Sequence, residues 1–193
     1  MDLLSDFNHK LILGSASPRR QQLLKDAGFS FKTISINADE SFSPSLQSEQ
    51  IPLYLAEKKA SVYPDTLKED ELLITADTVV WIDNIVLNKP ANDFEATQML
   101  QLLSGKMHQV FTGVCLKSNK KQVTFFDETK VHFKSLSENE IAYYIQNYKP
   151  FDKAGSYGAQ DWLGLVGIDK IEGSYFNVMG LPVHRLYKEL MEF

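Results

Sequence analysis

The sequence lacks several features that would place it in a specialised class of protein. It contains one cysteine, Cys115, so no disulfide can form within the chain, and no cysteine and histidine cluster has the spacing of a zinc site. No stretch approaches the ~18 uninterrupted apolar residues of a membrane-spanning helix. Basic residues are not in excess either. The chain has 20 lysines and arginines and 25 acidic residues, which gives a formal charge of −5. This balance argues against a nucleic-acid binder.

A secretory signal is also missing from the beginning of the sequence. The first ten residues, MDLLSDFNHK, include Asp2 and Asp6 and have neither a basic flank nor an apolar stretch. Together with the single cysteine, this predicts a cytoplasmic protein that binds no membrane. The composition, 44% hydrophobic and 23% charged, provides enough apolar surface for a large core. We therefore predict a single domain over residues 1–193.

Four common catalytic motifs are absent as well. The chain has no Gly-x-x-x-x-Gly-Lys phosphate loop, no Gly-x-Gly-x-x-Gly fingerprint, no Gly-x-Ser-x-Gly elbow and no His-Glu-x-x-His zinc pair. The side chains that are left to do chemistry are arginines, lysines and isolated acidic residues. Such a set suits hydrolysis of a phosphoanhydride, in which carboxylates hold Mg²⁺ or Mn²⁺, cations neutralise the polyphosphate and an acid activates water.

Strand and helix signals alternate along the chain. A short apolar strand is expected over residues 10–14, followed by a helix that begins after its N-cap Ser17 and ends before Gly28. Further helices are predicted over residues 51–60, 92–104, 137–145 and 181–193, with a capping pair at Asn92 and Glu95 and a capping box at Ser137 and Glu140. Further strands are predicted over 72–82, 85–87, 110–116 and 122–133, with a two-residue turn at residues 83–84. Residues 30–50 are expected to form a polar segment, and residues 155–173 a glycine-rich segment. This order predicts an α/β fold with a mixed central β-sheet flanked by helices.

Arg19 and Arg20 stand in the first turn of a predicted helix, where the unpaired N–H groups and the helix dipole disfavour cations. An anion held by residues 14–17, with both guanidinium groups closing over it, would turn this cluster into a phosphate cradle. Two solvated arginines on an exposed turn explain the pattern equally well.

Asp77 is the only charged residue within the apolar run 72–82. Burying an unpaired carboxylate costs several kcal/mol, so Asp77 requires a cation, a metal ion or a solvent-filled cleft. Lys89, just past the predicted returning strand, is a candidate cation. A polar bend at Asp77 and Thr78, separating two strands, is the simpler alternative, and the residues taken alone favour it.

Two other segments are rich in groups that contact ligands. Asp39, Glu40 and Lys59 frame a serine-rich loop, and residues 152–160 combine acid, base, amide and glycine. Plain turns are the alternative for the glycine-rich segment. His108 is expected to be a structural hydrogen-bonding residue rather than a catalyst.

Six short motifs span nearly the whole chain. They are GSASPRR at residues 14–20, ADTVV at 76–80, KP at 89–90, HQVFTG at 108–113, DKAGSYG at 152–158 and EGSYFNVMGLP at 172–182. In this order they resemble the Maf family of nucleoside triphosphate pyrophosphatases. The resemblance implies cleavage between the α and β phosphates, a divalent metal cofactor (Mg²⁺ or Mn²⁺), and an α/β fold, similar to that of inosine triphosphatases, whose mixed sheet forms a nucleotide-binding cleft.

The resemblance also implies roles for individual residues. Asp77 resembles the family's acceptor of the proton from the attacking water and, with Glu40, a metal ligand. The implied triphosphate contacts are Ser15, Arg20, Lys59 and Lys89. The residues that correspond to base-selecting positions of the dTTP- and UTP-specific branch are Arg19, Thr78 and Gln160. Residues 152–160 resemble that branch more than the 7-methyl-GTP branch, whereas Asn88 and Ala159 depart from the family pattern and affect the expected fine specificity.

The implied protein is a homodimeric dTTP and UTP pyrophosphatase, with modified pyrimidine nucleotides as further substrates and no nucleic-acid partner. The alternative is a non-enzymatic, nucleotide-binding regulator of septum formation, a process to which the family has been linked. A nucleic-acid binder that uses Arg19 and Arg20 is a weaker third hypothesis, because the chain is acidic and has no basic stripe.

Overall fold

A computed structural model describes residues 7–193, so Asp2 and Asp6, used above to argue against a signal segment, lie outside the described residues. The chain divides into two compact units. The first contains the described residues up to Asp77 together with Thr112–Asp127 and Gly180–Phe193, and the second contains Thr78–Phe111 and Glu128–Met179. Three strands, β3, β5 and β6, contribute residues to both units.

A mixed seven-stranded sheet runs through the fold in the order β2-β1-β3-β5-β6-β7, with β4 paired to β3. Strand β1 (Lys10–Leu13) is parallel to β2 (Phe31–Thr33) and to β3 (Glu71–Ile82). Antiparallel pairs join β4 (Ile85–Leu87) to β3 and β7 (Ile168–Glu172) to β6 (Gln122–Phe133). The remaining strand, β5 (Met107–Lys117), lies between β3 and β6. The predicted α/β fold with a mixed central sheet is confirmed, while the cleft stays a prediction.

The helices of the described chain are α1 (Pro18–Asp26), α2 (Gln50–Ser61), α3 (Asp93–Leu103), α4 (Glu138–Tyr148), α5 (Trp162–Gly167), α6 (Tyr175–Val178) and α7 (Val183–Met191), with a 3₁₀ turn at Ala154–Ser156. Side chains cap the free N–H groups at the start of α1, α3, α4 and α6. Ser17 caps α1, Asn92 caps α3, and Ser137 with Glu140 forms a capping box at α4, as predicted. Within residues 7–193, no helix has both the length and the apolar character needed to cross a membrane.

The elements that the sequence did not predict are all short. Strands β2 and β7 and helices α5 and α6 contain between three and six residues each. Segments of that length show too few positions for a hydrophobic period to be recognised. The predicted two-residue hairpin turn does form, with positive φ angles of 51° at Asp83 and 63° at Asn84.

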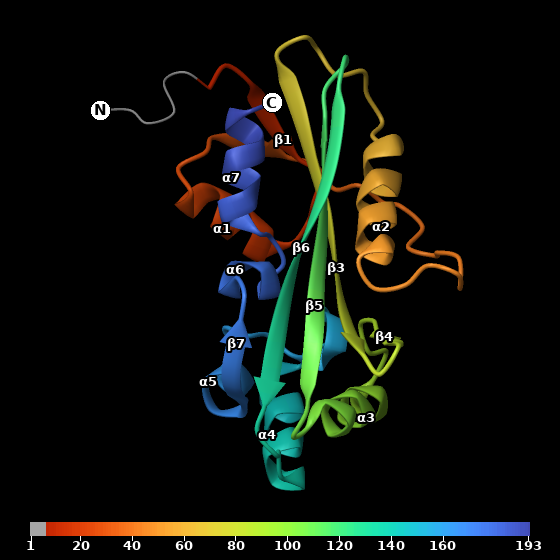
Figure 1. The fold of residues 1–193 in the computed structure, drawn as a ribbon, viewed down its shortest axis with the longest axis vertical. Coiled ribbons are helices and arrows are strands. Elements are labelled where there is room, and N and C mark those ends of the chain that lie inside the picture. Colours follow the sequence, from red (N-terminus) through yellow and green to blue (C-terminus); the bar gives the residue numbers. More distant parts are fainter. Residues whose placement is uncertain (1–6) are drawn as a thin grey trace. The chain divides into compact units, whose positions relative to one another are not determined.

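In the first unit, helices cover strands β1 and β3 on both faces, with α2 on one side and α1 and α7 on the other (Figure 1). Ala56 and Ala60 of α2 are fully buried and pack in one cluster with Ile12 and Leu73. Small side chains at these two positions let the helix lie close to the sheet.

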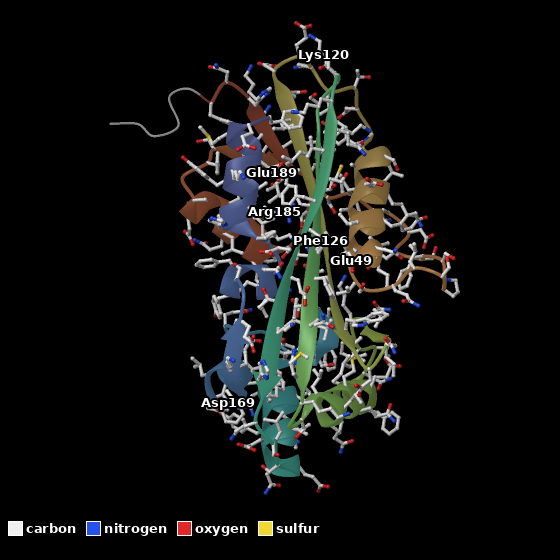
Figure 2. The ribbon with its side chains drawn as sticks, viewed as in Figure 1. Glu49, Lys120, Phe126, Asp169, Arg185 and Glu189 are labelled. Atoms are coloured by element: carbon white, nitrogen blue, oxygen red, sulfur yellow. The ribbon has the colours of Figure 1, made fainter. Side chains whose placement is uncertain are left out.

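Helix α7 is attached to β6 by an arginine. Arg185 donates a hydrogen bond to the main-chain oxygen of Phe126 and lies over the ring of Phe125, 5.2 Å from its centroid. Figure 2 shows Arg185 and Glu189 on α7 beside Phe126, and the arginine Nε lies 3.7 Å from the Glu189 carboxylate. The arginine therefore links the C-terminal helix to the sheet by a hydrogen bond and a ring contact, while its ion pair with Glu189 lies within the helix.

The second unit has its own hydrophobic core. Helices α3 and α4 lie against each other, and their buried residues Leu100, Leu103 and Tyr144 pack in one cluster with Val80 of β3 and Leu163 of α5. A core of this kind gives the second unit a rigid framework for the loop segments that connect its helices and strands.

Gly113 of β5 makes the close approach of α2 possible. A Cβ atom at this position would overlap the main chain of Pro52 and Leu53 in the first turn of the helix. Main-chain atoms cannot rotate away as a side chain can, so any larger residue at position 113 must displace α2.

We expect Gly113→Ala to lower the free energy of unfolding by about 2–3 kcal/mol, because it overpacks the contact between α2 and β5. For a chain of this size that corresponds to a fall in Tm of roughly 4–12 °C. Gly167→Ala is the control, since a Cβ there would meet only side-chain atoms, at 3.2 Å or more. Denaturant unfolding measures both variants, and equal small losses would contradict the assigned role of Gly113.

Candidate active site

The first group of predicted site residues lies where β1 ends and α1 begins. Gly14 follows the strand and its N–H donates to the oxygen of Ile74 at 2.8 Å. Next, the buried Ser15 hydroxyl accepts a hydrogen bond from the Ser17 N–H at 3.2 Å and another from Nη1 of Arg20 at 3.4 Å. Ser15, Ser17 and Arg20 are thus brought together at the N-terminus of α1, as the phosphate-cradle hypothesis requires.

The guanidinium of Arg20 is fixed mainly by main-chain oxygens. Its Nε donates to Gly180 at 2.7 Å and its Nη1 to Ala76 at 2.8 Å. Burial lowers the pKa of Arg20, and the neighbouring negative charge of Asp77 opposes that shift. The alternative of a solvated arginine on an exposed turn is therefore wrong for Arg20, whose positive charge is held beside Asp77.

Asp77 lies within an unbroken strand. Since β3 continues from Glu71 to Ile82, the alternative of a polar bend between two strands is wrong. The Asp77 side chain is 12% exposed, and its Oδ1 lies 2.5 Å from the Nζ of Lys59. The carboxylate thus has the cation partner that its burial required, and that cation is Lys59 of α2.

The packing of α2 on β3 explains how Lys59 reaches this carboxylate. Side chains alternate along a strand, so Thr75 and Asp77 share one face of β3. The Thr75 hydroxyl donates to the oxygen of Ala56 at 2.7 Å, which fixes the helix against this face. Lys59 follows Ala56 by three residues, almost one helical turn, and therefore projects toward Asp77.

The same lysine also contacts a predicted metal ligand. Nζ of Lys59 lies 2.9 Å from Oε1 of Glu40, whose side chain is 48% exposed. The preceding residues form a parallel pair, because Nζ of Lys58 lies 2.9 Å from Asp39. Hydrogen bonds from Ser41 and Lys58 hold the pKa of Asp39 well below its usual range. Two adjacent lysines therefore attach two adjacent acids of the loop to α2.

Asp77 and Glu40 form a donor set that suits a hard divalent cation. Both carboxylates converge on one positively charged atom, Nζ of Lys59. Mg²⁺ prefers such oxygen donors, and it is commonly bound by one or two carboxylates that are joined by water and substrate phosphates. Within residues 7–193, no group of three or more histidine, cysteine, aspartate or glutamate side chains has the geometry of a metal site. The two carboxylates fit a cation that also takes phosphate ligands.

Of the other predicted residues, Arg19 lies in the first turn of α1 in the first unit, whereas Thr78, Lys89 and Gln160 belong to the second unit. Thr78 is partly buried in β3, and Lys89 is exposed just after β4. The oxygen of Asn88 accepts a hydrogen bond from the N–H of Gly155 at 3.2 Å, so the residue before Lys89 contacts the 152–160 segment. This hydrogen bond places the start of the Lys-Pro motif next to the Asp-Lys-Ala-Gly motif.

Gln160 ends the 152–160 segment with an unusual amide. Its Oε1 is buried and, among residues 7–193, has no hydrogen-bond partner. A buried acceptor without a donor is destabilising unless a bound molecule supplies one. The amide oxygen is therefore suited to receive an N–H group from a ligand.

Two residues next to Gln160 were missed by the sequence analysis. The hydroxyl of Tyr144 donates to Oδ2 of Asp161 at 2.7 Å and accepts from the N–H of Gly158 at 3.0 Å. Tyr144 fits the apolar face of a helix, so its sequence position indicates only a core residue. The single available signal was Asp161, a charged residue directly after the motif that contains Gln160.

His108 is a buried structural residue, in agreement with its interpretation from sequence. Its Nε2 lies 2.6 Å from the Tyr157 hydroxyl, and its ring packs edge-on against Tyr157 and Phe133. Burial lowers the pKa of His108 to about 3, so the imidazole is neutral near pH 7.

Comparisons with known proteins agree on one family. The family model described as "Maf-like protein" matches residues 10–193. The dTTP/UTP pyrophosphatase of Phocaeicola vulgatus is 53% identical over 183 residues, which cover 94% of this chain and 95% of that protein. The dTTP/UTP pyrophosphatase of Parabacteroides distasonis is 51% identical over 187 residues, 96% of each chain.

A solved structure with a similar fold is that of the Staphylococcus aureus Ham1 protein. The match covers 93% of this chain and 99% of that one, with a TM-score of 0.51 and 12% sequence identity. At this identity the similarity concerns the fold alone, and it agrees with the mixed sheet flanked by helices described above.

The depressed pKa of His108 predicts that acid destabilises the fold through this residue. Between about pH 6.5 and 3 the unfolded chain binds a proton at His108 and the folded protein does not, so stability falls as the pH is lowered. Over that range we expect the wild type to lose up to ~1.4 kcal/mol per pH unit more than His108→Gln, which cannot titrate. Urea unfolding at pH 7 and at about pH 4.5 measures the difference, and parallel losses would contradict it.

Proposed function

The chain belongs to the Maf family, and on that basis we propose that it hydrolyses dTTP and UTP to the nucleoside monophosphate and pyrophosphate. Two relatives that are 53% and 51% identical to it are dTTP/UTP pyrophosphatases. The observation that carries the proposal is the buried Asp77 carboxylate, which contacts Lys59 and lies beside the Arg20 guanidinium. An acid flanked by cations is the arrangement that hydrolysis of a polyphosphate requires.

In this proposal Asp77 accepts the proton of the water that attacks the α-phosphorus. Triphosphate oxygens are bound by Ser15, Arg20, Lys59 and Lys89. Main-chain hydrogen bonds to Gly180 and Ala76 hold the Arg20 guanidinium in place before substrate arrives, which limits the reorganisation needed on binding. Positive charge from Arg20 and the lysines stabilises the negative charge that develops on the departing pyrophosphate.

A divalent cation, Mg²⁺ or Mn²⁺, completes the proposed chemistry, and Asp77 and Glu40 are the residues that would hold it. When bound, such a cation neutralises phosphate oxygens and lowers the pKa of water. The attachment of Glu40 to α2 through Lys59 supports this assignment, because it keeps an exposed loop carboxylate near Asp77.

Base selection is assigned to Arg19, Thr78 and Gln160. Uracil and thymine present an N3–H donor beside the O4 acceptor, and a side-chain amide can bind both with its oxygen and nitrogen. The buried Oε1 of Gln160, which has no partner within residues 7–193, supports its assignment to this contact. Asn88 and Ala159 differ from the residues usual in the family, and we propose that they adjust which pyrimidine nucleotides are preferred.

We further propose that residues 1–193 act as one pyrophosphatase domain, since strands β3, β5 and β6 contribute to both compact units. We also propose a homodimer, as the family resemblance implies. Its location in the cytoplasm, without a nucleic-acid or membrane partner, is proposed from the single cysteine, the acidic charge and the lack of a long apolar stretch.

The direct test is a panel of dTTP, UTP, CTP, ATP and GTP with Mg²⁺ or Mn²⁺, in which pyrophosphate and orthophosphate are measured separately. We expect pyrophosphate from dTTP and UTP. Orthophosphate as the sole product would exclude cleavage between the α and β phosphates. Nucleotide binding without either product would favour the non-enzymatic regulator of septum formation.

The role of Asp77 predicts the effect of one isosteric substitution. Asp77→Asn should lower kcat for pyrophosphate release by roughly 10²–10⁴-fold, because the amide cannot accept the proton. Asp39→Asn is the matched control, since Asp39 pairs with Lys58 as Glu40 pairs with Lys59, and it should change kcat less than about threefold. Thermal unfolding verifies that both variants are folded, and an undiminished rate in Asp77→Asn would refute the mechanism.

A further inference from the structure

Discrimination between uracil and cytosine by a glutamine depends on the direction in which its amide faces. Uracil and thymine place a donor at N3 and an acceptor at position 4, whereas cytosine places an acceptor at N3 and a donor at position 4. An amide with its oxygen toward N3 fits uracil. The same amide rotated by ~180° about its terminal C–C bond, so that its oxygen and nitrogen exchange places, fits cytosine. The torsion of such an amide is soft, so selection requires neighbouring groups that fix it.

The nitrogen of the Gln160 amide faces Gly158. A Cβ atom on Gly158 would lie 2.9 Å from Nε2 of Gln160 and 2.7 Å from Oδ2 of Asp161, so both atoms lie over the bare glycine. A carboxylate attracts the N–H groups of an amide and repels its oxygen. Asp161 therefore favours the orientation that keeps Nε2 on the Gly158 side and leaves Oε1 as the available acceptor.

Tyr144 fixes the carboxylate that exerts this preference. Its hydroxyl donates to Oδ2 of Asp161 at 2.7 Å and accepts from the N–H of Gly158 at 3.0 Å. Gly158 and Asp161 are also the ends of a turn that has Gln160 at its centre, closed by a hydrogen bond from the Asp161 N–H to the Gly158 oxygen at 3.0 Å. One buried hydroxyl thus holds both ends of the turn that presents Gln160.

The surroundings keep the hydrogen-bond donor in place. Burial, with a further contribution from the bond to Asp161, raises the pKa of Tyr144, so its hydroxyl stays protonated at neutral pH. Lys153 balances the charge of Asp161, with Nζ 3.5 Å from Oδ2. The Tyr144 ring is stacked on that of Tyr148 at 5.1 Å, which restricts its motion.

We propose that Tyr144 and Asp161 are positioning residues that fix the amide of Gln160 and thereby set the preference for uracil and thymine over cytosine. The inference rests on the proposed function, in which Gln160 reads the base. Neither residue contacts the nucleotide in this proposal, and both act through Gln160.

The test measures binding of the α,β-methylene analogues of UTP and CTP by calorimetry, so that no turnover is required. The wild type should prefer the uracil analogue, and Tyr144→Phe should lower this preference roughly tenfold, as loss of one oriented base contact does. The kcat for UTP should change less than threefold, because the reacting groups are untouched. Gln160→Ala should lose the preference to at least the same extent.

A double-mutant cycle shows whether the effect passes through the amide. In the Gln160→Ala background, Tyr144→Phe should produce no further loss of preference, since there is no amide left to orient. Tyr148→Phe is the matched control on the same helix and should keep the wild-type preference. Asp161→Ala provides a second route to the same loss of preference if Tyr144→Phe does not fold.

An unchanged preference in Tyr144→Phe, or in Asp161→Ala if the tyrosine variant does not fold, would overturn the inference. A further loss in the Gln160→Ala background would do the same. A wild type that binds both analogues equally would overturn it while leaving pyrophosphate release intact. A wild type that prefers the uracil analogue but releases no pyrophosphate would instead refute the proposed function, and the variants would still decide the role of Tyr144.

Discussion

The ion pair between Lys59 and Asp77 is the interaction on which the candidate site depends. A carboxylate inside a buried strand is tolerated only with a close counter-charge, and removing one partner of such a pair typically costs about 3–5 kcal/mol. Delivering the lysine requires α2 to lie tightly on the sheet. The fully buried Ala56 and Ala60, and the absence of a side chain at Gly113, make this approach possible. The core packing of the first unit is thereby coupled to the charge arrangement of the site.

Cations reach the middle of β3 from two helices. Lys59 of α2 contacts the Asp77 side chain, whereas Arg20 of α1 donates to the oxygen of Ala76, the preceding residue. The two helices lie on opposite faces of this part of the sheet (Figure 1). One short strand segment therefore has an acid beside positive charges from both helices, an environment suited to a highly charged anion.

Sequence reasoning succeeded where local rules determine the structure. Ser17, Asn92 and Ser137 marked helix starts because capping depends on a few consecutive residues, and Asp77 stood out because a charge in an apolar run needs a partner. The partner itself depends on how α2 packs on β3, so residue chemistry alone pointed to Lys89, and only the family resemblance assigned Lys59 to the site. Tyr144 was missed because its hydrogen bonds join α4 to a turn.

The paired lysines at the end of α2 have different exposures to the solvent. Lys58 and Asp39, the first pair that attaches the acidic loop, are 23% and 70% exposed, whereas Lys59 and Glu40, the second pair, are 11% and 48% exposed. Dissolved salt shields exposed charges from one another far more than enclosed ones. Rising ionic strength will therefore weaken the Lys58–Asp39 attachment of the acidic loop more than the Lys59–Glu40 attachment.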